Sequence, residues 1–368
     1  MKLTNASSAA AGWMVGFQRD GRELLVVMIK ATYQLPRQGE PAARCAQQVP
    51  LIEADEFEGE PGISAPRYET DYAQLKPGCD VLLLGSAHAP AGTAVRRVEV
   101  GLTVGSMTKR LAVVGDRHWS KGTLGLSASD PEPFVSCPIS YGRAFGGTDR
   151  TKEESQNKTD TFLANPAGLG YWRYIDEIDG KPLPNTEEID RPVTGYDGKY
   201  VPMAFSPIGR TWEPRCHFSG TYDENWFENQ APFWPDDFDY RYFQAAPADQ
   251  VIPYLVGGEM VVLENLCSDG TRAFQLPAGR MPVTFIPQRG KDAVREAVLD
   301  TLLIEPDENR FTMTWRCGLA LGKSVFDVKE IIAGEMSAAW HRARRFPNKI
   351  YYNNLAELVA ARRKGAAK

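Results

Sequence analysis

Short apolar runs separated by turn-forming residues fill the first and last thirds of the chain. Residues 13–18 and 23–35 flank a turn that contains Asp20 and Gly21. Asp-Gly between apolar runs predicts a β-hairpin, because both residues tolerate a positive φ. Residues 95–104 alternate apolar and polar side chains, as in a strand with one solvated face. This spacing favours antiparallel sheets over parallel strands joined by helices.

The same pattern predicts more strands on both sides of a long irregular middle region. Residues 298–304 and 311–317 form a second expected hairpin around the polar turn 305–310. Apolar and polar residues alternate within 311–317, which gives that strand one apolar face. The other predicted strands are 80–87, 109–114, 117–126, 259–266, 272–276 and 283–287, of which the last three are expected to form a meander.

Helices are predicted mainly near the end of the sequence. One candidate is 328–345, and a second is 355–363, with Asn354 as N-cap and Glu357 three residues later. The pattern as a whole predicts a mainly β protein with antiparallel, sandwich-like sheets and one or two C-terminal helices. The expected parts, which together form one compact unit, are an N-terminal sheet part (1–137), a loop-rich region packed on the sheets (138–253), a C-terminal β part (254–345) and a basic helical tail (346–368).

The composition of residues 138–253 differs from that of the rest of the chain. This region holds 12 of the 26 prolines and 20 of the 38 aromatic residues. Within it, residues 211–250 contain three tryptophans, five phenylalanines, three tyrosines and, from residue 221 on, seven carboxylates. A connection with this many aromatic side chains is costly to leave in water. It therefore either packs on its own scaffold or contacts a partner.

Whole-chain composition disfavours several classes of function. A net charge of -5 over 368 residues gives no general electrostatic reason to bind nucleic acid. No apolar run is long enough to span a membrane, and residues 1–12 lack the apolar stretch of a signal peptide. The six cysteines and four histidines are scattered, without zinc-site spacing. We therefore predict reduced thiols, a cytoplasmic protein, no metal site and no cofactor.

The end of the sequence is basic. Residues 337–368 carry eight lysines or arginines and one acidic residue, Glu357. This imbalance predicts a solvated basic end, and a contact with an acidic partner surface is the alternative.

Two glycine-rich motifs are candidates for ligand binding. Residues 142–149 read GRAFGGTD. They lack the spacing of a phosphate-binding loop, so we interpret them as a tight turn in which Arg143 ties Asp149 or a nearby carbonyl. Residues 165–170 read NPAGLG, which indicates a turn with close backbone approach.

The carboxylates of residues 213–239 are candidates for catalysis. Together with the aromatic residues beside them, they leave open a carbohydrate-active enzyme. The alternative is that these aspartates cap turns and pair with arginine, which is the commoner use of aspartate in proline-rich loops. No GxSxG motif indicates a serine nucleophile.

Both glycine-rich motifs precede GTYDENW at 220–226, PDDFDYRYF at 235–243 and AAPADQ at 245–250. This ordered set resembles a bacterial family of unknown function encoded beside type VI secretion genes, over roughly residues 13–345. The resemblance implies a non-enzymatic adaptor or chaperone. Such a protein would bind a toxic effector in the cytosol of a Gram-negative bacterium and assist its loading on the spike of VgrG and PAAR proteins. A secreted structural component of the spike is a further alternative.

The aromatic segment supplies the residues that we predict to contact a protein partner. Trp and Tyr give large contact area at low entropic cost, and carboxylates around them complement basic partner segments. Trp226 is expected in the core, whereas the placement of Trp234 stays open. The predicted partner-binding residues are Trp212, Phe233, Trp234, Asp236, Asp237 and Asp239. The residues expected to fix the shape of the motifs are Arg143, Phe145, Gly146, Gly147, Asp149, Asn165, Pro166, Tyr222, Asp223, Trp226 and Arg241.

Overall fold

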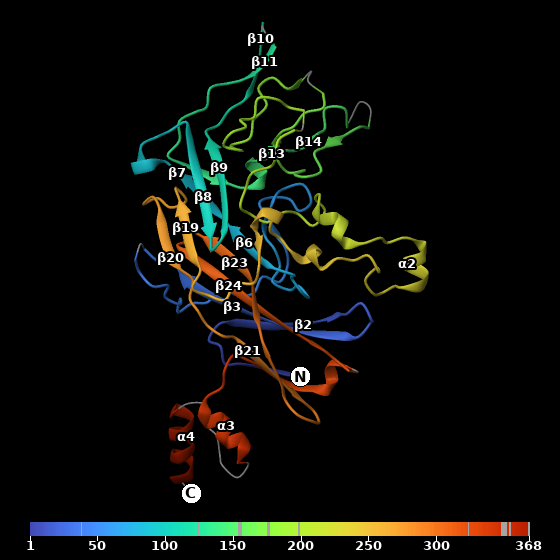
Figure 1. Ribbon diagram of the computed structural model, residues 1–368, viewed down its shortest axis with the longest axis vertical. Coiled ribbons are helices and arrows are strands. Elements are labelled where there is room, and N and C mark those ends of the chain that lie inside the picture. Colours follow the sequence, from blue (N-terminus) through green and yellow to red (C-terminus); the bar gives the residue numbers. More distant parts are fainter. Residues whose placement is uncertain are drawn as a thin grey trace.

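Two packed sheets, built from strands far apart in the sequence, form the body of the protein (Figure 1). The computed structural model describes residues 1–37, 39–123, 125–153, 157–174, 177–197, 199–322, 324–346, 352 and 355–366. The six-stranded sheet has the order β18 (Val251–Ile252), β6 (Cys79–Leu83), β23 (Val298–Glu305), β24 (Arg310–Ala320), β3 (Glu23–Gln34) and β2 (Ala10–Phe17). The five-stranded sheet has the order β17 (Thr186–Glu187), β9 (Met107–Val114), β8 (Arg97–Val104), β19 (Met260–Glu264) and β20 (Arg272–Gln275).

Strand pairing joins the beginning of the chain to its last third. Both predicted hairpins are confirmed, since β2 pairs with β3 and β23 pairs with β24 in antiparallel register. β24 continues onto β3 over eleven residue pairs, and β6 lies parallel to β23. Strands from the expected parts 1–137 and 254–345 therefore pair with one another within one sheet.

Alternation of side chains along the strands places one apolar face of each sheet in a shared core. Leu25, Val27 and Ile29 of β3 belong to the same buried cluster as Val100 and Leu102 of β8. Burial of these β-branched and aliphatic side chains is the main favourable term in forming the two layers. The prediction of a mainly β, antiparallel, sandwich-like architecture is confirmed.

A four-stranded sheet lies below the body and leads to the C-terminal helices (Figure 1). Its order is β1 (Lys2–Asn5), β25 (Val328–Ala333), β21 (Pro282–Pro287) and β22 (Ala293–Glu296). The helix predicted over 328–345 is wrong in its first half, because the apolar, β-branched run in β25 pairs with β1 and β21. Gly334 then takes φ 90°, and Ser337 caps the shorter α3 (Ala338–Arg345).

The second predicted helix is present as α4 (Leu355–Ala366). Its expected cap, Asn354, and the residues 347–351 before it lie outside the described residues. Among the helices of the described residues, none is long and apolar enough to cross a bilayer.

Three strand predictions need correction. The single strand over 117–126 is wrong, because this segment turns back on itself after Gly122 and forms the antiparallel pair β10 (Trp119–Gly122) and β11 (Gly125–Ala128). The meander over 259–287 is wrong at its last strand, because β21 does not pair with β20. It pairs with β25 in the four-stranded sheet instead. The strand over 80–87 divides at Leu84 into β6 and β7 (Gly85–His88). Short two-stranded ribbons complete the fold: β7 with β12 (Ser136–Ile139), β10 with β11, β13 (Phe145–Gly146) with β16 (Leu169–Gly170), β14 (Thr148–Asp149) with β15 (Asp160–Thr161), and β4 (Glu56–Phe57) with β5 (Pro66–Tyr68).

Candidate functional site

The inner part of the aromatic segment 211–250 is packed against the body. Trp212 is 4% exposed, and Phe238 and Phe243 are buried. Trp234 stacks on Phe238 with ring centroids 4.3 Å apart, and Tyr240 packs edge-on against the same ring. Burial of so many rings offsets the entropy of ordering a long irregular connection. The segment therefore largely forms its own core.

Two arginines join the start of the segment to the residues that flank the ribbon of β4 and β5. Arg215, fully buried in the turn η4 (Arg215–Ser219), donates to both oxygens of Glu69 and to the carbonyls of Ile208 and Tyr242. Arg210 donates to Asp55 at 2.8 Å and also contacts Glu69. Burial raises the pKa of the Asp55 carboxyl, but the hydrogen bonds from Arg210 and from the Thr70 amide, together with the charges of Arg210 and Arg215, outweigh burial and bring that pKa below its ordinary value.

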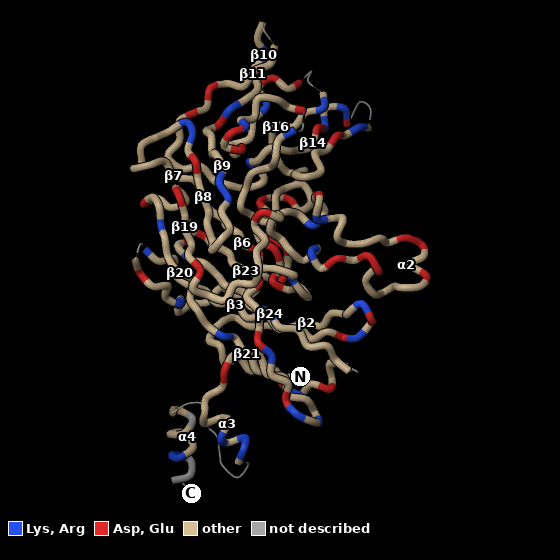
Figure 2. Tube along the Cα trace, in the orientation of Figure 1, with Lys and Arg blue, Asp and Glu red and all other residues tan. Residues whose placement is uncertain are grey.

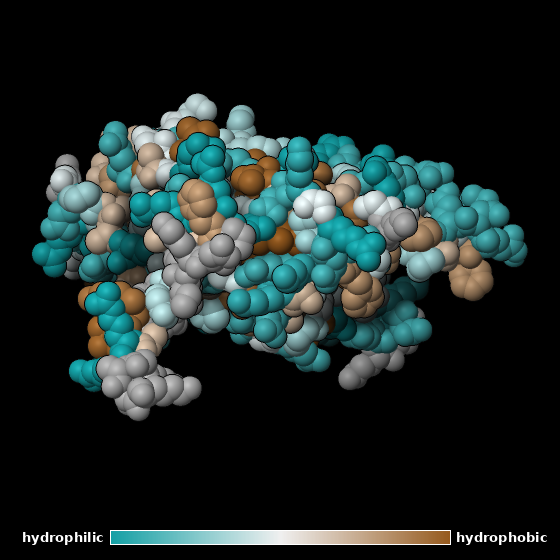
Figure 3. Space-filling model, turned by 90° about the horizontal axis from the view of Figure 1, so that it is seen from below, coloured by the Kyte–Doolittle hydropathy of each residue, from teal (hydrophilic) through white to brown (hydrophobic). Residues whose placement is uncertain are grey.

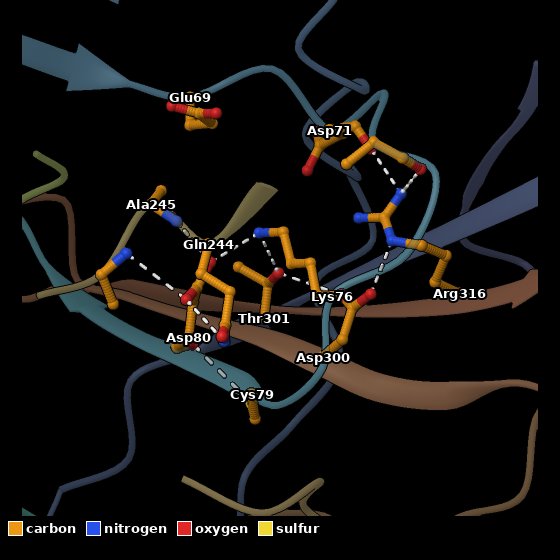
Figure 4. A network of polar contacts seen from close by, with 12 residues as sticks. Glu69, Asp71, Lys76, Cys79, Asp80, Gln244, Ala245, Asp300, Thr301 and Arg316 are labelled. Carbon is orange, nitrogen blue, oxygen red and sulfur yellow. Dashed lines mark hydrogen bonds and ion pairs between the residues drawn. The ribbon is translucent and has the colours of Figure 1, made fainter. Parts of the chain in front are cut away.

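The end of the segment is fastened to β6 through Asp80, whose side chain is fully buried (Figure 4). Asp80 accepts hydrogen bonds from the backbone amides of Ala245 and Ala246 and forms an ion pair of 2.7 Å with Lys76. Lys76 also donates to Thr301 at 2.9 Å. Each charge has a partner, as buried charges require.

A second buried pair lies beside the first on the same face of the six-stranded sheet (Figure 4). Arg316 of β24 donates to Asp300 at 2.6 Å and to the carbonyls of Asp71 and Ala73. Asp71 in turn pairs with Lys30 at 2.8 Å. This face of the sheet therefore binds its covering loops through buried ionic contacts as well as through apolar packing, such as that of Leu82 and Leu303 on Ala245.

The outer part of the segment forms a projection, which we define as residues 220–237. It contains the helix α2 (Glu224–Asn229) and extends from the side of the body (Figure 1). Asp223 caps α2 through the amide of Trp226 at 2.8 Å, and the indole of Trp226 donates to the carbonyl of Phe233. Asp237 closes the base of the projection by accepting from the amide and hydroxyl of Thr221.

The surface of the projection is acidic and partly aromatic. Aspartate and glutamate residues occur along α2 and along the irregular segment that returns from it (Figure 2). No lysine or arginine occurs in 220–237. Phe227 is 72% exposed and Tyr222 50% exposed. Seen from below, the projection at the right-hand end is mostly hydrophilic, with a hydrophobic group near its tip (Figure 3).

A cavity of about 480 Å³ lies at the base of the projection. It opens between η4 and the turn η5 (Tyr240–Phe243), which lead into and out of the projection. Its walls are mainly apolar. The lining residues are Tyr141, Ala164, Val201, Pro202, Ile208, Glu213, Pro214, Arg215, Phe218, Arg241, Gln244, Ala246, Pro247, Ala248 and Val251.

The predicted partner-binding residues are placed unequally. Trp212 is a correction, because its ring packs in the core against Tyr141 and presents no outer surface. Phe233 and Trp234 are half-buried, and Phe233 packs edge-on against Phe17 of β2. Asp236, Asp237 and Asp239 lie along the returning part of the segment, with Asp236 and Asp237 exposed.

The carboxylates considered for catalysis have local structural contacts. Asp239 caps η5 and pairs with Arg241 at 2.6 Å, and this contact lowers the pKa of Asp239. Asp236 accepts from the side chain of Gln230. Glu213 lies 3.5 Å from His217. These contacts are of the turn-capping and pairing kind.

The two glycine-rich motifs pack on each other. Phe145 and Gly146 pair with Leu169 and Gly170 in the parallel ribbon β13–β16. The buried Asn165 donates to the carbonyls of Tyr141 and Phe145. Pro166 follows it, and its carbonyl accepts from the Thr148 hydroxyl.

Gly146 and Gly147 have positive φ, and a Cβ on Gly146 would lie 2.2 Å from the Asn165 carbonyl oxygen. Glycine is therefore required where the two motifs meet.

The contacts of Arg143 and Asp149 differ from the predicted pair. Arg143 donates to Asn185 at 3.0 Å and lies 3.8 Å from Asp116. Asp149 is buried and accepts from the amides of Thr151, Arg173 and Tyr174. These hydrogen bonds outweigh the effect of burial and lower the pKa of Asp149. Both residues shape the loop, as predicted, but through different partners.

The sequence model of a family described as "Uncharacterized protein conserved in bacteria (DUF2169)" matches residues 20–316. The chain belongs to this bacterial family. The matched part of the DUF2169 chain includes the cavity, the projection and the buried ion pairs, and it ends within β24 before the C-terminal helices. No curated protein and no solved structure has significant similarity to the chain.

Two features of the DUF2169 chain are absent from the sequence-based prediction. The buried charges Lys76, Asp80 and Asp300 lie beside apolar runs, and only this position signals that they are buried. The cavity joins residues from 141 to 251 that no motif connects. Among the described residues, no group of three or more His, Cys, Asp or Glu is arranged to hold a metal ion.

Proposed function

We propose that the protein is a cytoplasmic adaptor or chaperone of type VI secretion, which binds a toxic effector and assists its loading on the VgrG–PAAR spike. The observation that carries the proposal is the acidic projection with exposed Phe227 and Tyr222, which extends from the side of the body. Exposed aromatic side chains surrounded by polar residues are typical of surfaces that bind another protein. Membership of the DUF2169 family supports the proposal through the resemblance of its motifs.

The electrostatics of the projection fit protein recognition. Its carboxylates lie around exposed rings, an arrangement that speeds encounter with a basic surface and sets orientation. Its base is fixed by Asp237 and Thr221, so little ordering entropy is lost on binding. A preorganised projection of this kind suits reversible capture of a partner.

The test is deletion of the gene, followed by measurement of the cellular level and the secretion of the neighbouring effectors. We expect both to fall for one effector and to recover when the wild-type gene is returned. A projection variant, Tyr222→Ala/Glu224→Lys/Phe227→Ala/Glu228→Lys, should fail to restore secretion although it folds, because all four side chains are exposed. Phe326→Ala, at an 83% exposed residue of the C-terminal third, is the matched control and should restore it.

Unchanged secretion of every neighbouring effector after deletion would overturn the proposal. Appearance of the protein itself in the culture supernatant, without lysis, would favour a secreted component of the spike instead.

A further inference from the structure

We infer that the cavity at the base of the projection binds one large apolar side chain of a basic peptide segment in a partner protein. The identity of that partner as an effector rests on the proposed function. The site itself is argued from the walls, the polar groups and the charges of the described residues.

The walls of the cavity fit an apolar side chain. Val201, Pro202, Ile208 and Pro247 contribute aliphatic surface, and Phe218 contributes a ring. A volume of about 480 Å³ lies within the usual range of ligand pockets, which are mostly apolar with a few polar groups. An apolar side chain that enters the cavity is removed from water. Such desolvation is typical of the few residues that contribute most of the binding energy in an interface.

The lining also contains a tyrosine whose ring is held in place by the core. Tyr141 is 3% exposed, and its ring is held edge-on by Trp212 at 5.7 Å. Tyr141 carries a hydroxyl in this otherwise mainly apolar lining. A few polar groups among apolar walls are what orients a ligand in a pocket. The backbone of a bound peptide would form a hydrogen bond with this hydroxyl.

The charges around the cavity select a basic segment. Arg241 at the rim is already occupied, because it pairs with Asp239 and its guanidinium lies 4.3 Å over the ring of Phe218. Glu213 lines the cavity with its side chain 44% exposed. The projection that rises from the rim adds exposed carboxylates, which are Asp223, Glu224, Glu228, Asp236 and Asp237.

The basic tail of a second copy of this chain is the competing occupant. It carries Leu355, which is 75% exposed, on α4. However, α3 already lies on its own molecule, where Arg344 pairs with Asp292 and Trp340 lines a pocket with Thr284 and Val294. Leu355 is presented by a helix, and an extended segment reaches into a cavity more readily than a helix does, so we favour a partner protein.

The experiment is selection of binders from phage-displayed random twelve-residue peptides on the full-length protein. We expect the recovered peptides to share one large apolar residue flanked by lysine or arginine. Recovery of no binder, or of binders without this pattern, would overturn the inference.

The recovered peptides are then titrated against variants. Ala248 is an exposed residue of the lining, so Ala248→Trp fills the cavity without disturbing the core, and we expect at least tenfold weaker binding. Ala94→Trp, at an exposed residue outside the lining, is the matched control and should bind as the wild type does. Tyr141→Phe should weaken binding about two- to tenfold, as expected for one hydrogen bond.

Three results separate the possibilities. Equal binding by Ala248→Trp and wild type would overturn the cavity as the site, even if the secretion test supports the adaptor function. Normal secretion after gene deletion, together with loss of peptide binding in Ala248→Trp, would leave the peptide site standing without that function. Self-association in solution that disappears on removal of residues 337–368 and is blocked by Ala248→Trp would replace the partner protein with a second copy.

Discussion

Asp80 has an unusual number of roles for one side chain. It lies in β6, is fully buried, and joins the end of the aromatic segment to the six-stranded sheet through two backbone amides and Lys76. Taking two charges out of water is costly, so such a pair adds little net stability by itself. Its main effect is to fix the position of the cavity wall, because Ala246, whose amide donates to Asp80, lines the cavity.

Asp80→Asn should lower the free energy of unfolding by about 3–5 kcal/mol, because Lys76 is left buried and unpaired. Lys76→Met/Asp80→Asn should recover part of the loss, since it removes the orphaned charge. Urea unfolding of wild type, both single variants and the double variant gives the coupling energy. A single-variant loss below about 1 kcal/mol would show that water or relaxation replaces the ion pair.

Tyr68 links β5 to the Glu305 carboxylate at 2.7 Å. Burial, together with that hydrogen bond, raises the pKa of Tyr68 to about 12. The folded state therefore holds the phenolic proton more tightly than the unfolded chain, whose tyrosines titrate near the ordinary value of 10.0. This contribution is complete below pH 10 and is lost as the pH rises towards 12.

We accordingly expect Tyr68→Phe to lose less stability than the wild type between pH 10 and pH 12. Denaturant unfolding at several pH values in this window measures the difference. Parallel curves for the two proteins would contradict the assignment.

Alanine substitution of Trp234 and of Trp226 should cost different amounts of stability. Trp234 packs on Phe238 and Phe243, so Trp234→Ala should cost about 3 kcal/mol of stability. Trp226 is half-buried within the projection and contacts Tyr222 and Phe233, so Trp226→Ala should cost less and mainly loosen α2. Thermal unfolding compares the two, and an equal loss would place both rings in the same cooperative unit.

At the scale of elements, the C-terminal helices contribute differently from the strand before them. β25 is a central strand that pairs with β1 and β21. α3 contacts β22 and its turn chiefly through Arg344 and Asp292, an exposed ion pair of the kind that contributes about 0.2–1 kcal/mol.

Removal of residues 337–368 should therefore change the free energy of unfolding by about 1 kcal/mol or less. Removal from residue 325 onward, which also takes β25, should abolish cooperative unfolding. Circular dichroism during urea titration distinguishes the two truncations. A large loss from the shorter truncation would mean that α3 completes the core.

Local patterns allowed the hairpins to be predicted, because β2–β3 and β23–β24 are each encoded by neighbouring residues with a polar turn. Patterns failed where a non-local partner decided the outcome. Val328–Ala333 fits a helix or a strand by composition, and only the strands beside it select β25. The polar face of β24 likewise gave no sign that loops would cover Thr312, Thr314 and Arg316.

The candidate site followed the same rule. Self-packing of the aromatic segment could be predicted from its content of aromatic rings and prolines. Which of the rings are exposed could not be predicted, because the buried Trp212 and the exposed Phe227 have similar neighbours in sequence. The cavity arises where residues near 141, 201 and 246 meet, which no local pattern encodes.

At the scale of the whole molecule, the burial of the cysteine thiols reflects how closely the sheets are packed. Cys79, Cys137, Cys267 and Cys317 are buried, whereas Cys45 and Cys216 are half-buried. Burial raises the pKa of Cys267 to about 11 and that of Cys317 to about 12, so their reactive thiolate is scarce near neutral pH.

In the native protein we expect two thiols to react readily with a thiol reagent at pH 8, and all six to react in denaturant. Mass spectrometry of the labelled protein identifies the sites. Rapid labelling of Cys79 or Cys317 in buffer would show that the sheets open far more often than their packing indicates.

The parallel pairing of β1 with β25, and of β6 with β23, has a consequence for biosynthesis. β1 meets β25, and the second edge of β3 meets β24, only after about 300 further residues have been made, and β6 meets β23 after about 220. Contacts so distant in sequence slow folding and leave unpaired strand edges exposed in the meantime. A protein that we propose keeps another protein soluble is thus itself dependent, during its own synthesis, on protection from aggregation.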